Sequence, residues 1–492
     1  MGLAAQDPGT FLAANSGPLA VEFSSRSKSV RLTSTSGAVL AASGSEAIRD
    51  LLALASARKL WAQDAATQER EHFKFLQELG NPRIHCALTV DRALAPARDK
   101  PTPPSGQALA QLVASFAGAS PVAKRHALDA EYEDYLWRAV ARRGYLLHRQ
   151  DLAIERRTRH HELADFAREY GVDIRRSDEL KSEWLAARGV KFTRTEDYGW
   201  SRPSSCDISA MPEQHTEAWE AYSKAHLTLK RVQILDGLAR RQHTDGRVRP
   251  LIRTNQAVSG RMAVRDPGMQ SIPTELRHVF VVEPGFDLIG FDHSNAELRV
   301  LARLMGDAAF TKRVLHGDPY AEIAEVTGRT RNEEKWRLLA FSYGQQEDSL
   351  AEIVGVEQAH ATHEAIKSLF PEIPQWCREQ TARARRGETL TTLSGRPLPK
   401  LTGRPRERFF KAANLLVQGS ARDAFGLGVR RAAERLGESN LWFPLHDELF
   451  VLSPKGHNDE TAAALDEAMT IDLGEGVVLT GTPKVYRGRW GK

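Results

Sequence analysis

The chain has 492 residues, of which 27% are charged, and its formal net charge at pH 7 is +5. This length allows about three domains, each with its own apolar core, and the mildly basic balance is compatible with a polyanionic partner. The 3 cysteines form no CxxC pair and no apolar run approaches the roughly 18 residues that span a bilayer, so the composition indicates neither a cysteine zinc site nor a membrane protein and predicts a soluble cytoplasmic protein.

The N-terminal residues predict a small α/β unit. A strand pair is expected at Leu19–Phe23 and Ser29–Thr33, followed by a helix from Ser45 to about Arg58 with apolar residues at helical spacing. The proline-rich segment Ala95–Gly106 predicts a surface loop or linker.

A helical region begins near Asp134. Helical spacing runs to Tyr170, and a second long helix is expected from Glu217 to about Arg241. Between them, Thr193–Pro212 is rich in Ser, Pro and Gly, which predicts an extended tip loop. Both helices are rich in basic residues, which suits a phosphate backbone, although a solvated helix face explains the same charge equally well.

The stretch Asp287–Arg299 predicts a strand followed by a helix. The apolar run Leu288–Phe291 places Asp292 at the end of the strand, and helical spacing starts at Asn295. An aspartate in this position is more often an N-cap than a metal ligand. A second acid beside Asp292 would favour a metal site.

The segment Arg331–Gly344 predicts one helix. Successive steps of four residues advance about 400°, so side chains at that spacing form a slowly drifting stripe. The stripe consists of Arg331, Lys335, Leu339 and Tyr343. Two cations followed by an apolar and an aromatic side chain match the order of phosphates and base in a nucleoside triphosphate. An amphipathic helix with a salt-bridged face is the alternative, because two glutamates flank the cations.

The tripeptide His446–Glu448 lies between two apolar runs, Leu441–Leu445 and Leu449–Leu452. This pattern predicts either a hairpin whose turn presents the acids or one strand that continues through them. Acids in hairpin turns are usually structural. The absence of Gly or Asn at this turn breaks the local rule, which is typical of functional sites.

Taken together, these stretches resemble motifs A, B and C of the family A DNA polymerases, the group of bacterial DNA polymerase I and many phage replicative polymerases. The three motifs are matched by Asp292–Arg299, by Arg331, Lys335, Tyr343 and Gly344, and by the intact His446–Glu448. Further matches follow in family order at Ser259–Met262, Asp266–Pro273, Thr392–Arg396, Asn414 and Val417–Ser420.

The resemblance implies an α+β fold with the right-hand polymerase architecture of thumb, palm and fingers, preceded by a small α/β exonuclease-like domain. The expected divisions are a reduced exonuclease-like domain at 1–132, the thumb at 133–250, the palm at 251–305 and 385–492, and the fingers at 306–384. The first exonuclease motif of the family is Asp-x-Glu, whereas its best counterpart here is Glu22-Phe23-Ser24. A two-metal nuclease needs its carboxylates, so we expect no proofreading.

The resemblance also assigns roles to single residues. Two Mg²⁺ ions, for which Mn²⁺ can substitute, would be held by Asp292, Asp447 and the backbone carbonyl of His293. The catalytic residues would be Asp292, Asp447, Glu448 and Lys335. The dNTP would contact Arg331, Lys335, Leu339, Tyr343, Gly344, Glu297 as the steric gate against ribose, and Tyr320. The DNA would contact Arg261, Gln270, Asn414, Gln418 and His446.

Three positions depart from the family pattern. Leu339 replaces the aromatic residue of motif B, His293 replaces the tyrosine that follows the metal-binding aspartate, and Tyr320 replaces a histidine of the fingers. Both polar substitutes can still form hydrogen bonds, so we expect altered tuning and no loss of activity.

The sequence therefore predicts a template-directed DNA polymerase that adds dNTPs to a primer 3′-hydroxyl by two-metal phosphoryl transfer and releases pyrophosphate. The expected partners are primer-template DNA and dNTPs, for a monomer in the cytoplasm of a bacterium or a phage-infected cell. An inactive DNA-binding replication factor is the alternative. A single-subunit RNA polymerase is a nearer rival, against which Glu297 argues.

Overall fold

The computed structural model describes most of the chain from residue 113 onwards and shorter pieces before it. The described residues are 12–14, 17–24, 27–36, 38–43, 47–48, 51–52, 60–62, 65, 84–86, 113–176, 183–188, 194–195, 199–200, 213–404 and 408–491. Among these residues, no helix combines the length and the apolar character needed to cross a membrane.

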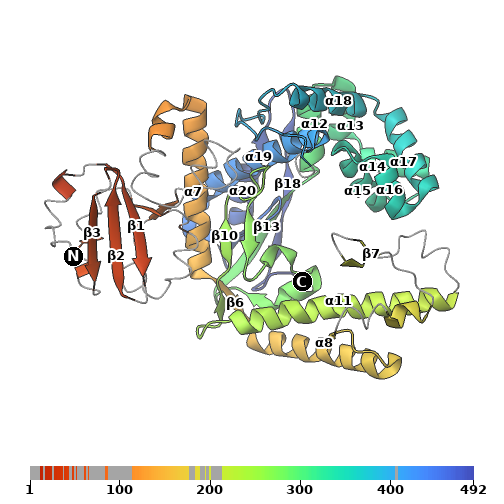
Figure 1. Cartoon of the computed structure of the whole chain (residues 1–492), viewed down its shortest axis with the longest axis horizontal. Helices are drawn as coiled ribbons and strands as arrows, with labels where there is room; N and C mark the ends of the chain where they lie inside the picture. Colours follow the sequence, from red (N-terminus) through yellow and green to blue (C-terminus); the bar gives the residue numbers. More distant parts are fainter. Residues whose placement is uncertain are drawn as a thin grey trace.

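A four-stranded antiparallel sheet lies at the centre of the molecule, with the strand order β14-β15-β13-β18 (Figure 1). Its strands are β13 (Phe286–His293), β14 (Leu441–Leu445), β15 (Glu448–Pro454) and β18 (Gly481–Tyr486). The apolar run predicted before Asp292 is confirmed as part of β13. This strand is buried over most of its length, because β15 and β18 pair with its two edges and helix α20 (Asn458–Met469) packs against it.

The predicted hairpin at the acidic tripeptide is also confirmed. Strands β14 and β15 pair with Leu445 opposite Glu448, so His446 and Asp447 form the turn. His446 adopts a positive φ of 55°, which makes this tight turn possible without glycine at a cost of about 1–2 kcal/mol. The alternative of a single strand running through the acids is wrong.

A lobe of helices lies above the sheet in Figure 1. It contains α12 (Ala296–Met305), α13 (Ala308–His316), α14 (Pro319–Thr327), α15 (Arg331–Ser342), α16 (Glu347–Val354), α17 (Val356–Leu369) and α18 (Glu372–Arg385). All of these helices except α16 share an apolar core with α19 (Ala412–Leu436), in which the rings of Phe310 and Phe370 lie 5.7 Å apart. The buried residues of α16 pack in a smaller cluster with Ala359 of α17. The helix predicted from the motif B pattern is α15.

Two long helices form an arm below the sheet in Figure 1, namely α8 (Arg149–Tyr170) and α11 (Glu213–Arg241). Both were predicted from helical spacing, and they pack along each other through a core that includes Phe166 and Trp219. Within the predicted tip loop, the described residues form a short hairpin of β7 (Arg194–Thr195) and β8 (Gly199–Trp200). The other residues of that loop lie outside the described part of the chain.

Short strands and a further helix join the arm to the sheet. They are α7 (Pro121–Arg143), β6 (Tyr145–Leu147), β9 (Arg247–Val248), β10 (Leu251–Arg253), β11 (Ala263–Arg265) and β12 (Phe280–Val281). Strand β6 pairs with both β9 and β12, while β10 and β11 form an antiparallel pair. Tyr145 of β6 packs edge-on against Trp442 and Phe443 of β14, which ties this region to the main core.

The N-terminal region forms a separate sheet with the strand order β3-β2-β1-β4-β5, beside α7 in Figure 1. Its strands are β1 (Leu19–Ser24), β2 (Ser29–Ser34), β3 (Val39–Ser43), β4 (Leu60–Ala62) and β5 (Ile84–Cys86). The predicted strand pair is confirmed as the antiparallel pair β1–β2. The predicted helix Ser45–Arg58 lies mostly outside the described residues, and the segment Ala95–Gly106 lies wholly outside them.

Candidate active site

Three acidic residues lie at one end of the central sheet. In the antiparallel pairing of β13 with β15, Asp292 lies directly opposite Glu448, and Asp447 precedes Glu448 in the hairpin turn. Asp292 is exposed, whereas Asp447 and Glu448 are half-buried. The strand register thus brings together the two strand-end acids that the sequence predicts as metal ligands.

The Glu448 carboxyl has an unusual proton affinity. Burial, followed by the negative charge of Asp292, raises the pKa of Glu448 to about 7, against the opposing charges of Arg277 and Lys484. Carboxylates crowded in this way take up a proton or attract a cation. The donors at this end of the sheet are hard oxygen atoms, which are the ligands that Mg²⁺ prefers.

Two glycines allow the backbones to approach closely here. A Cβ on Gly290 would lie 2.8 Å from the Phe450 ring and 2.9 Å from Oε1 of Glu448. A Cβ on Gly481, which pairs with His293, would lie 2.2 Å from the carbonyl oxygen of Asp292. A side chain at Gly290 would therefore displace Phe450 and Glu448, and a side chain at Gly481 would displace the backbone of Asp292.

Arg261 connects the carboxylates to the first helix of the lobe. Its guanidinium lies 2.6 Å from Glu297 of α12 and 3.9 Å from Asp447. Burial, and next the charge of Glu297, raise the pKa of the Tyr343 hydroxyl at the end of α15. The structure therefore gathers residues predicted to contact DNA, sugar and base around one carboxylate, that of Glu297.

Buried ion pairs hold the backbone on which Arg261 sits. Arg396 donates to Asp423 of α19 at 2.7 Å and to the carbonyl of Ser259 at 2.9 Å. Arg422 donates to the carbonyl of Gly260 at 2.9 Å. The matched segments Ser259–Met262 and Thr392–Arg396, far apart in the chain, are therefore joined at α19.

Two acidic residues of these buried ion pairs, Asp423 and Glu133, were not predicted from the sequence. Burial alone would raise the pKa of Asp423, but Arg396 and Arg422 hold it below its ordinary value. Glu133 of α7 accepts from Arg422 at 2.7 Å and also pairs with Arg430. In the sequence, the sign of these ion pairs was the presence of charged residues among the mainly apolar residues of α19.

The predicted motif B residues lie along α15, and their side chains are more buried toward the C-terminal end of the helix. Arg331 and Lys335 are exposed, whereas Leu339 and Tyr343 are half-buried. The two glutamates that favoured a salt-bridged face have other partners. Glu333 closes a capping box with Thr330, and Glu334 is buried against Arg337 at 2.7 Å. Gly344, with φ of 86°, then turns the chain at a point where a Cβ would lie 3.0 Å from Phe410.

Tyr320 lies deeper than a surface contact residue would. Its side chain is 1% exposed, and burial raises the pKa of its hydroxyl. The Arg331 guanidinium lies 5.2 Å from the Tyr320 ring and donates to Asp318 at 2.5 Å. The Tyr320 ring therefore packs against the Arg331 guanidinium.

His293, at the position where the family has tyrosine, is buried and hydrogen-bonded. Its Nε2 lies 2.8 Å from the carbonyl of Met469 at the end of α20, and because a carbonyl only accepts, Nε2 carries the proton. Its ring packs edge-on against Phe291 at 5.4 Å. Burial lowers the pKa of His293. The side chain therefore fastens the end of β13 to α20.

The remaining residues predicted to contact DNA differ in how far they are buried. Gln270, Asn414 and Gln418 are half-buried, and His446 is exposed in the turn beside Asp447. Oδ1 of Asn414 is buried without a hydrogen-bond partner among the described residues. The polar atom of Asn414 is thus available to a ligand or to a rearranged side chain.

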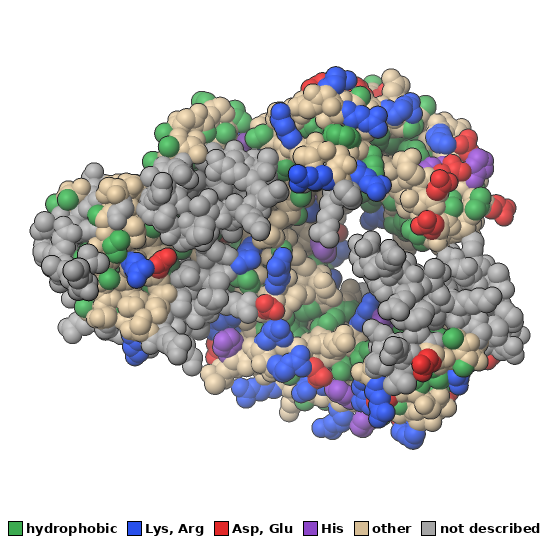
Figure 2. All heavy atoms as spheres, in the orientation of Figure 1, with side chains coloured by type: hydrophobic (Ala, Val, Ile, Leu, Met, Phe, Trp, Pro, Cys, Tyr) green, Lys and Arg blue, Asp and Glu red, His purple; other side chains and the backbone are tan. Residues whose placement is uncertain are grey.

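Figure 2 shows a hollow below the helical lobe, with Lys and Arg side chains on the lobe above it and on the α8–α11 arm further below. Part of the positive charge of the arm is neutralised internally, because Arg156 pairs with Asp236 at 2.8 Å and Arg231 with Glu275 at 2.5 Å. Lys224 is exposed. The arm therefore carries both paired and exposed cations, which is compatible with either expectation, and phosphate binding by this surface stays a prediction.

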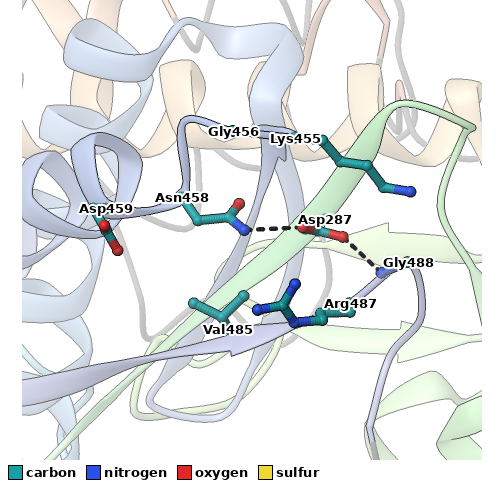
Figure 3. Close-up of a pocket in the computed structure, with 8 residues that line it drawn as sticks. All are labelled: Asp287, Lys455, Gly456, Asn458, Asp459, Val485, Arg487 and Gly488. Carbon is teal, nitrogen blue, oxygen red and sulfur yellow. Dashed lines mark hydrogen bonds between the residues drawn. The ribbon is translucent and has the colours of Figure 1, made fainter.

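A cavity of about 540 Å³ lies at the opposite end of β13. Figure 3 shows the Asp287 carboxylate at its wall, where it accepts from Nδ2 of Asn458 at 2.9 Å and from the backbone N–H of Gly488 at 3.0 Å. Lys455 and Arg487 also line this cavity. It lies at the start of the strand, whereas the three carboxylates lie at its end.

Comparison with known proteins identifies the class. The structure of the POL domain of Pol1 from M. smegmatis, solved with DNA primer-template and dNTP, has a TM-score of 0.76, 17% sequence identity and 99% coverage of both chains. The predicted α+β right-hand polymerase fold is therefore confirmed. The sequence model of DNA polymerase family A matches residues 204–481, which is more than half of the chain, and the chain belongs to this family.

Curated relatives are similar at the sequence level. The DNA polymerase of Mycobacterium phage L5 is 28% identical over 337 residues, which cover 66% of this chain and 55% of the relative. The thermostable DNA polymerase I of Thermus aquaticus is 28% identical over 305 residues, which cover 56% of this chain and 36% of the relative. The matched part thus spans about half the length of the phage relative and about a third of the bacterial one.

The buried pair Arg396–Asp423 gives a stability prediction. Asp423→Asn leaves the Arg396 charge without its partner, so the free energy of unfolding at pH 7 should fall by about 3–5 kcal/mol in urea titrations. Because the pKa of Asp423 is lowered in the folded state, its contribution is present above the unfolded pKa and is lost as pH falls through the folded value. The difference between the wild type and the variant should therefore shrink in acid.

The exposed pair Arg435–Glu467, at 2.6 Å, provides the matched control. Glu467→Gln should change the free energy of unfolding by no more than about 1 kcal/mol, because solvent screens exposed ion pairs. Equal effects of the two substitutions would contradict a structural role for the buried pair.

The close approach at Gly481 gives a second prediction. Gly481→Ala should lower the free energy of unfolding by about 1–3 kcal/mol, because its methyl group must displace the end of β13. Gly118 is exposed, and a Cβ there would have nothing within 4 Å, so Gly118→Ala should stay within about 0.5 kcal/mol of the wild type. Chemical denaturation of both variants measures the difference, and an unaffected Gly481→Ala protein would contradict the packing argument.

Proposed function

We propose that this chain is a template-directed DNA polymerase that adds dNTPs to a primer 3′-hydroxyl and releases pyrophosphate. The observation that carries this proposal is the register of β13 with β15, which puts Asp292 beside Asp447 and Glu448 in a chain of DNA polymerase family A. The solved M. smegmatis relative was bound to DNA primer-template and dNTP, which supports the same substrates here. We place the reaction in the cytoplasm of a bacterium or a phage-infected cell.

The donor set fits two Mg²⁺ ions. Asp292 and Asp447, with the backbone carbonyl of His293, would hold them, and Mn²⁺ could substitute because it accepts the same hard oxygen ligands. Bound Mg²⁺ would help to deprotonate the 3′-hydroxyl and to neutralise the pyrophosphate. Glu448, which lies opposite Asp292 in the pairing of β13 with β15, would stand beside the two ions in an auxiliary role.

Helix α15 would bind the triphosphate. Arg331 and Lys335 are exposed cations on the first two turns of this helix, and Lys335 would also donate a proton to the leaving pyrophosphate. Leu339 and Tyr343 would follow with the apolar and aromatic surface for sugar and base. The capping box at Thr330 fixes the start of the helix, which supports a defined position for both cations.

The DNA would lie in the hollow between the lobe and the arm. Arg261, Gln270, Gln418 and His446 would contact the primer end, while α8 and α11 would contact the phosphate backbone. Under this proposal the arm is the thumb, the helical lobe forms most of the fingers and the central sheet is the palm. The N-terminal sheet would be the reduced exonuclease-like domain without proofreading.

Asp292→Ala tests the reaction. This substitution removes a metal ligand, so primer extension should fall at least ~10³-fold while primer-template binding, measured by fluorescence anisotropy, is retained. Asp459→Ala removes an exposed acid beside the cavity at the other end of β13 and should leave extension unchanged.

Extension that persists in Asp292→Ala would overturn the assignment. Wild-type protein that binds primer-template but incorporates nothing, in Mg²⁺ or Mn²⁺, would instead support the inactive DNA-binding replication factor.

Glu297→Ala tests the choice of sugar. Arg261 holds the Glu297 carboxylate at 2.6 Å, and its removal would open space for a ribose 2′-hydroxyl. The preference for dNTPs over rNTPs, measured as the ratio of kcat/KM values, should fall roughly 10–100-fold. Glu325→Ala, an exposed change on α14, should keep the ratio. An unchanged ratio in Glu297→Ala would exclude Glu297 as the steric gate.

A further inference from the structure

Helix α7 lies between the N-terminal sheet and the central sheet in Figure 1, and it contacts both β5 and β10. Three of its charged side chains, those of Glu133, Asp134 and Arg138, are each no more than 2% exposed. Charged side chains are almost never buried to this extent unless they are paired. Their partners lie in different parts of the chain, so α7 joins those parts through buried polar contacts.

The Arg138 guanidinium connects the N-terminal sheet to a carboxylate of α7. Its Nη2 donates to the backbone carbonyl of Ile84 at 2.7 Å, and its Nε donates to Oδ2 of Asp134 at 2.7 Å. Ile84 belongs to β5, which stands at the end of the described strand order, where a side chain from α7 can reach its backbone. Contact with β5 helps to bury this ion pair, and the low local dielectric strengthens its hydrogen bonds.

The second oxygen of Asp134 holds the start of the loop that leads to Arg261. This Arg261 loop comprises residues 254–261 and begins directly after β10. Oγ1 of Thr254, which is 2% exposed, donates to Oδ1 of Asp134 at 3.0 Å. The next residue, Asn255, has a positive φ of 50°, a backbone conformation that persists where surrounding contacts hold it. The buried carboxylate supplies one of these contacts.

The same helix also holds the far end of the Arg261 loop. Glu133 accepts from Arg422 at 2.7 Å, and Arg422 donates to the carbonyl of Gly260 at 2.9 Å. Two adjacent carboxylates of α7 therefore fix the loop at both ends. Arg138 connects this arrangement to β5, because it pairs with one of the two carboxylates.

We propose that Arg138 and Asp134 are positioning residues for Arg261, and that the N-terminal sheet is the support that holds them in place. Contact with β5 orients Arg138, Arg138 orients Asp134, and Asp134 fixes the start of the Arg261 loop. Arg261 then lies 2.6 Å from Glu297. This inference rests on the proposed function, which assigns Arg261 to the primer end and Glu297 to the choice of sugar. It gives the reduced N-terminal domain a task that needs no nuclease carboxylates.

Hydrogen exchange of the full chain, followed by mass spectrometry, tests these contacts without reference to catalysis. The backbone N–H groups of Gln256 and Ala257 donate to the carbonyl of Arg261, so their exchange reports opening of the loop. Thr254→Val removes the hydroxyl, and exchange in the loop should become roughly 3–10-fold faster, the factor that one hydrogen bond contributes. Thr254→Ser keeps the hydroxyl and should restore slow exchange.

Arg138→Met tests the link to the N-terminal sheet. Exchange should become faster in β5 as well as in the Arg261 loop, whereas Thr254→Val should leave β5 at the wild-type rate. Arg143→Met is the matched control, because Arg143 lies on the same helix and donates at 2.5 Å to the carbonyls of Ser439 and Leu441, which belong to neither region. It should leave both regions unchanged. Peptides of α11 are the internal reference, since a general loss of stability would raise exchange there too.

The preference for dNTPs over rNTPs gives a second readout. When the Arg261 loop is loosened, Glu297 loses a fixed partner, so the ratio of kcat/KM values should fall about 3-fold or more in Thr254→Val. Thr254→Ser should restore the ratio. A purely structural loss would instead lower both kcat/KM values together and leave their ratio unchanged.

The outcomes separate the two proposals. Wild-type loop exchange in Thr254→Val, equal loop exchange in Arg138→Met and Arg143→Met, or an unchanged sugar ratio in Thr254→Val would overturn the positioning role. If Arg138→Met does not fold, the Thr254 variants decide. A wild-type protein that extends no primer would contradict the proposed function, and hydrogen exchange would still show whether Asp134 and Arg138 hold the loop.

Discussion

The double pairing of β13 is the constraint on which the proposed site depends. β15 fixes one edge of this strand and β18 the other, and side chains on a strand alternate between faces, so a shift of one residue would turn Asp292 to the opposite face. Close contacts at Gly290 and Gly481 oppose any such shift. Backbone hydrogen bonds and packing therefore hold the carboxylates in place despite the repulsion between Asp292 and Glu448.

Residues around β13 also stabilise the sheet and its charged end. Phe291, Phe443, Phe450 and Trp490 belong to the apolar core that stabilises the sheet, and this core reaches Phe291, the residue next to Asp292. At the charged end, Arg261 supplies compensating positive charge, and its backbone is in turn held by Arg396 and Arg422. An energetic cost of crowding acids is thus offset by a rigid, buried support, which is how strained arrangements persist at functional sites.

Local elements could be predicted from the sequence because their signals are local. Apolar runs predicted β13 and the β14–β15 hairpin, a stripe of side chains at four-residue spacing predicted α15, and the resemblance to family motifs singled out the carboxylates. The partners that support them could not be predicted in this way. Arg396 contacts Ser259 across 137 positions of sequence, and His293 contacts Met469 across 176, so neither contact leaves a periodic pattern. The burial of Tyr320 likewise depends on packing in the lobe.

His293 illustrates why a departure from a family pattern need not disrupt a site. A tyrosine would present its hydroxyl well beyond the ring, whereas the shorter imidazole carries its donor on the ring itself. The carbonyl of Met469 lies 2.8 Å from Nε2, so the partner in α20 is close enough to meet the shorter side chain. The adjoining backbone approach at Gly481 leaves little room at this point of the sheet. The histidine therefore belongs to a local arrangement in which ring, helix end and neighbouring strand are matched to one another.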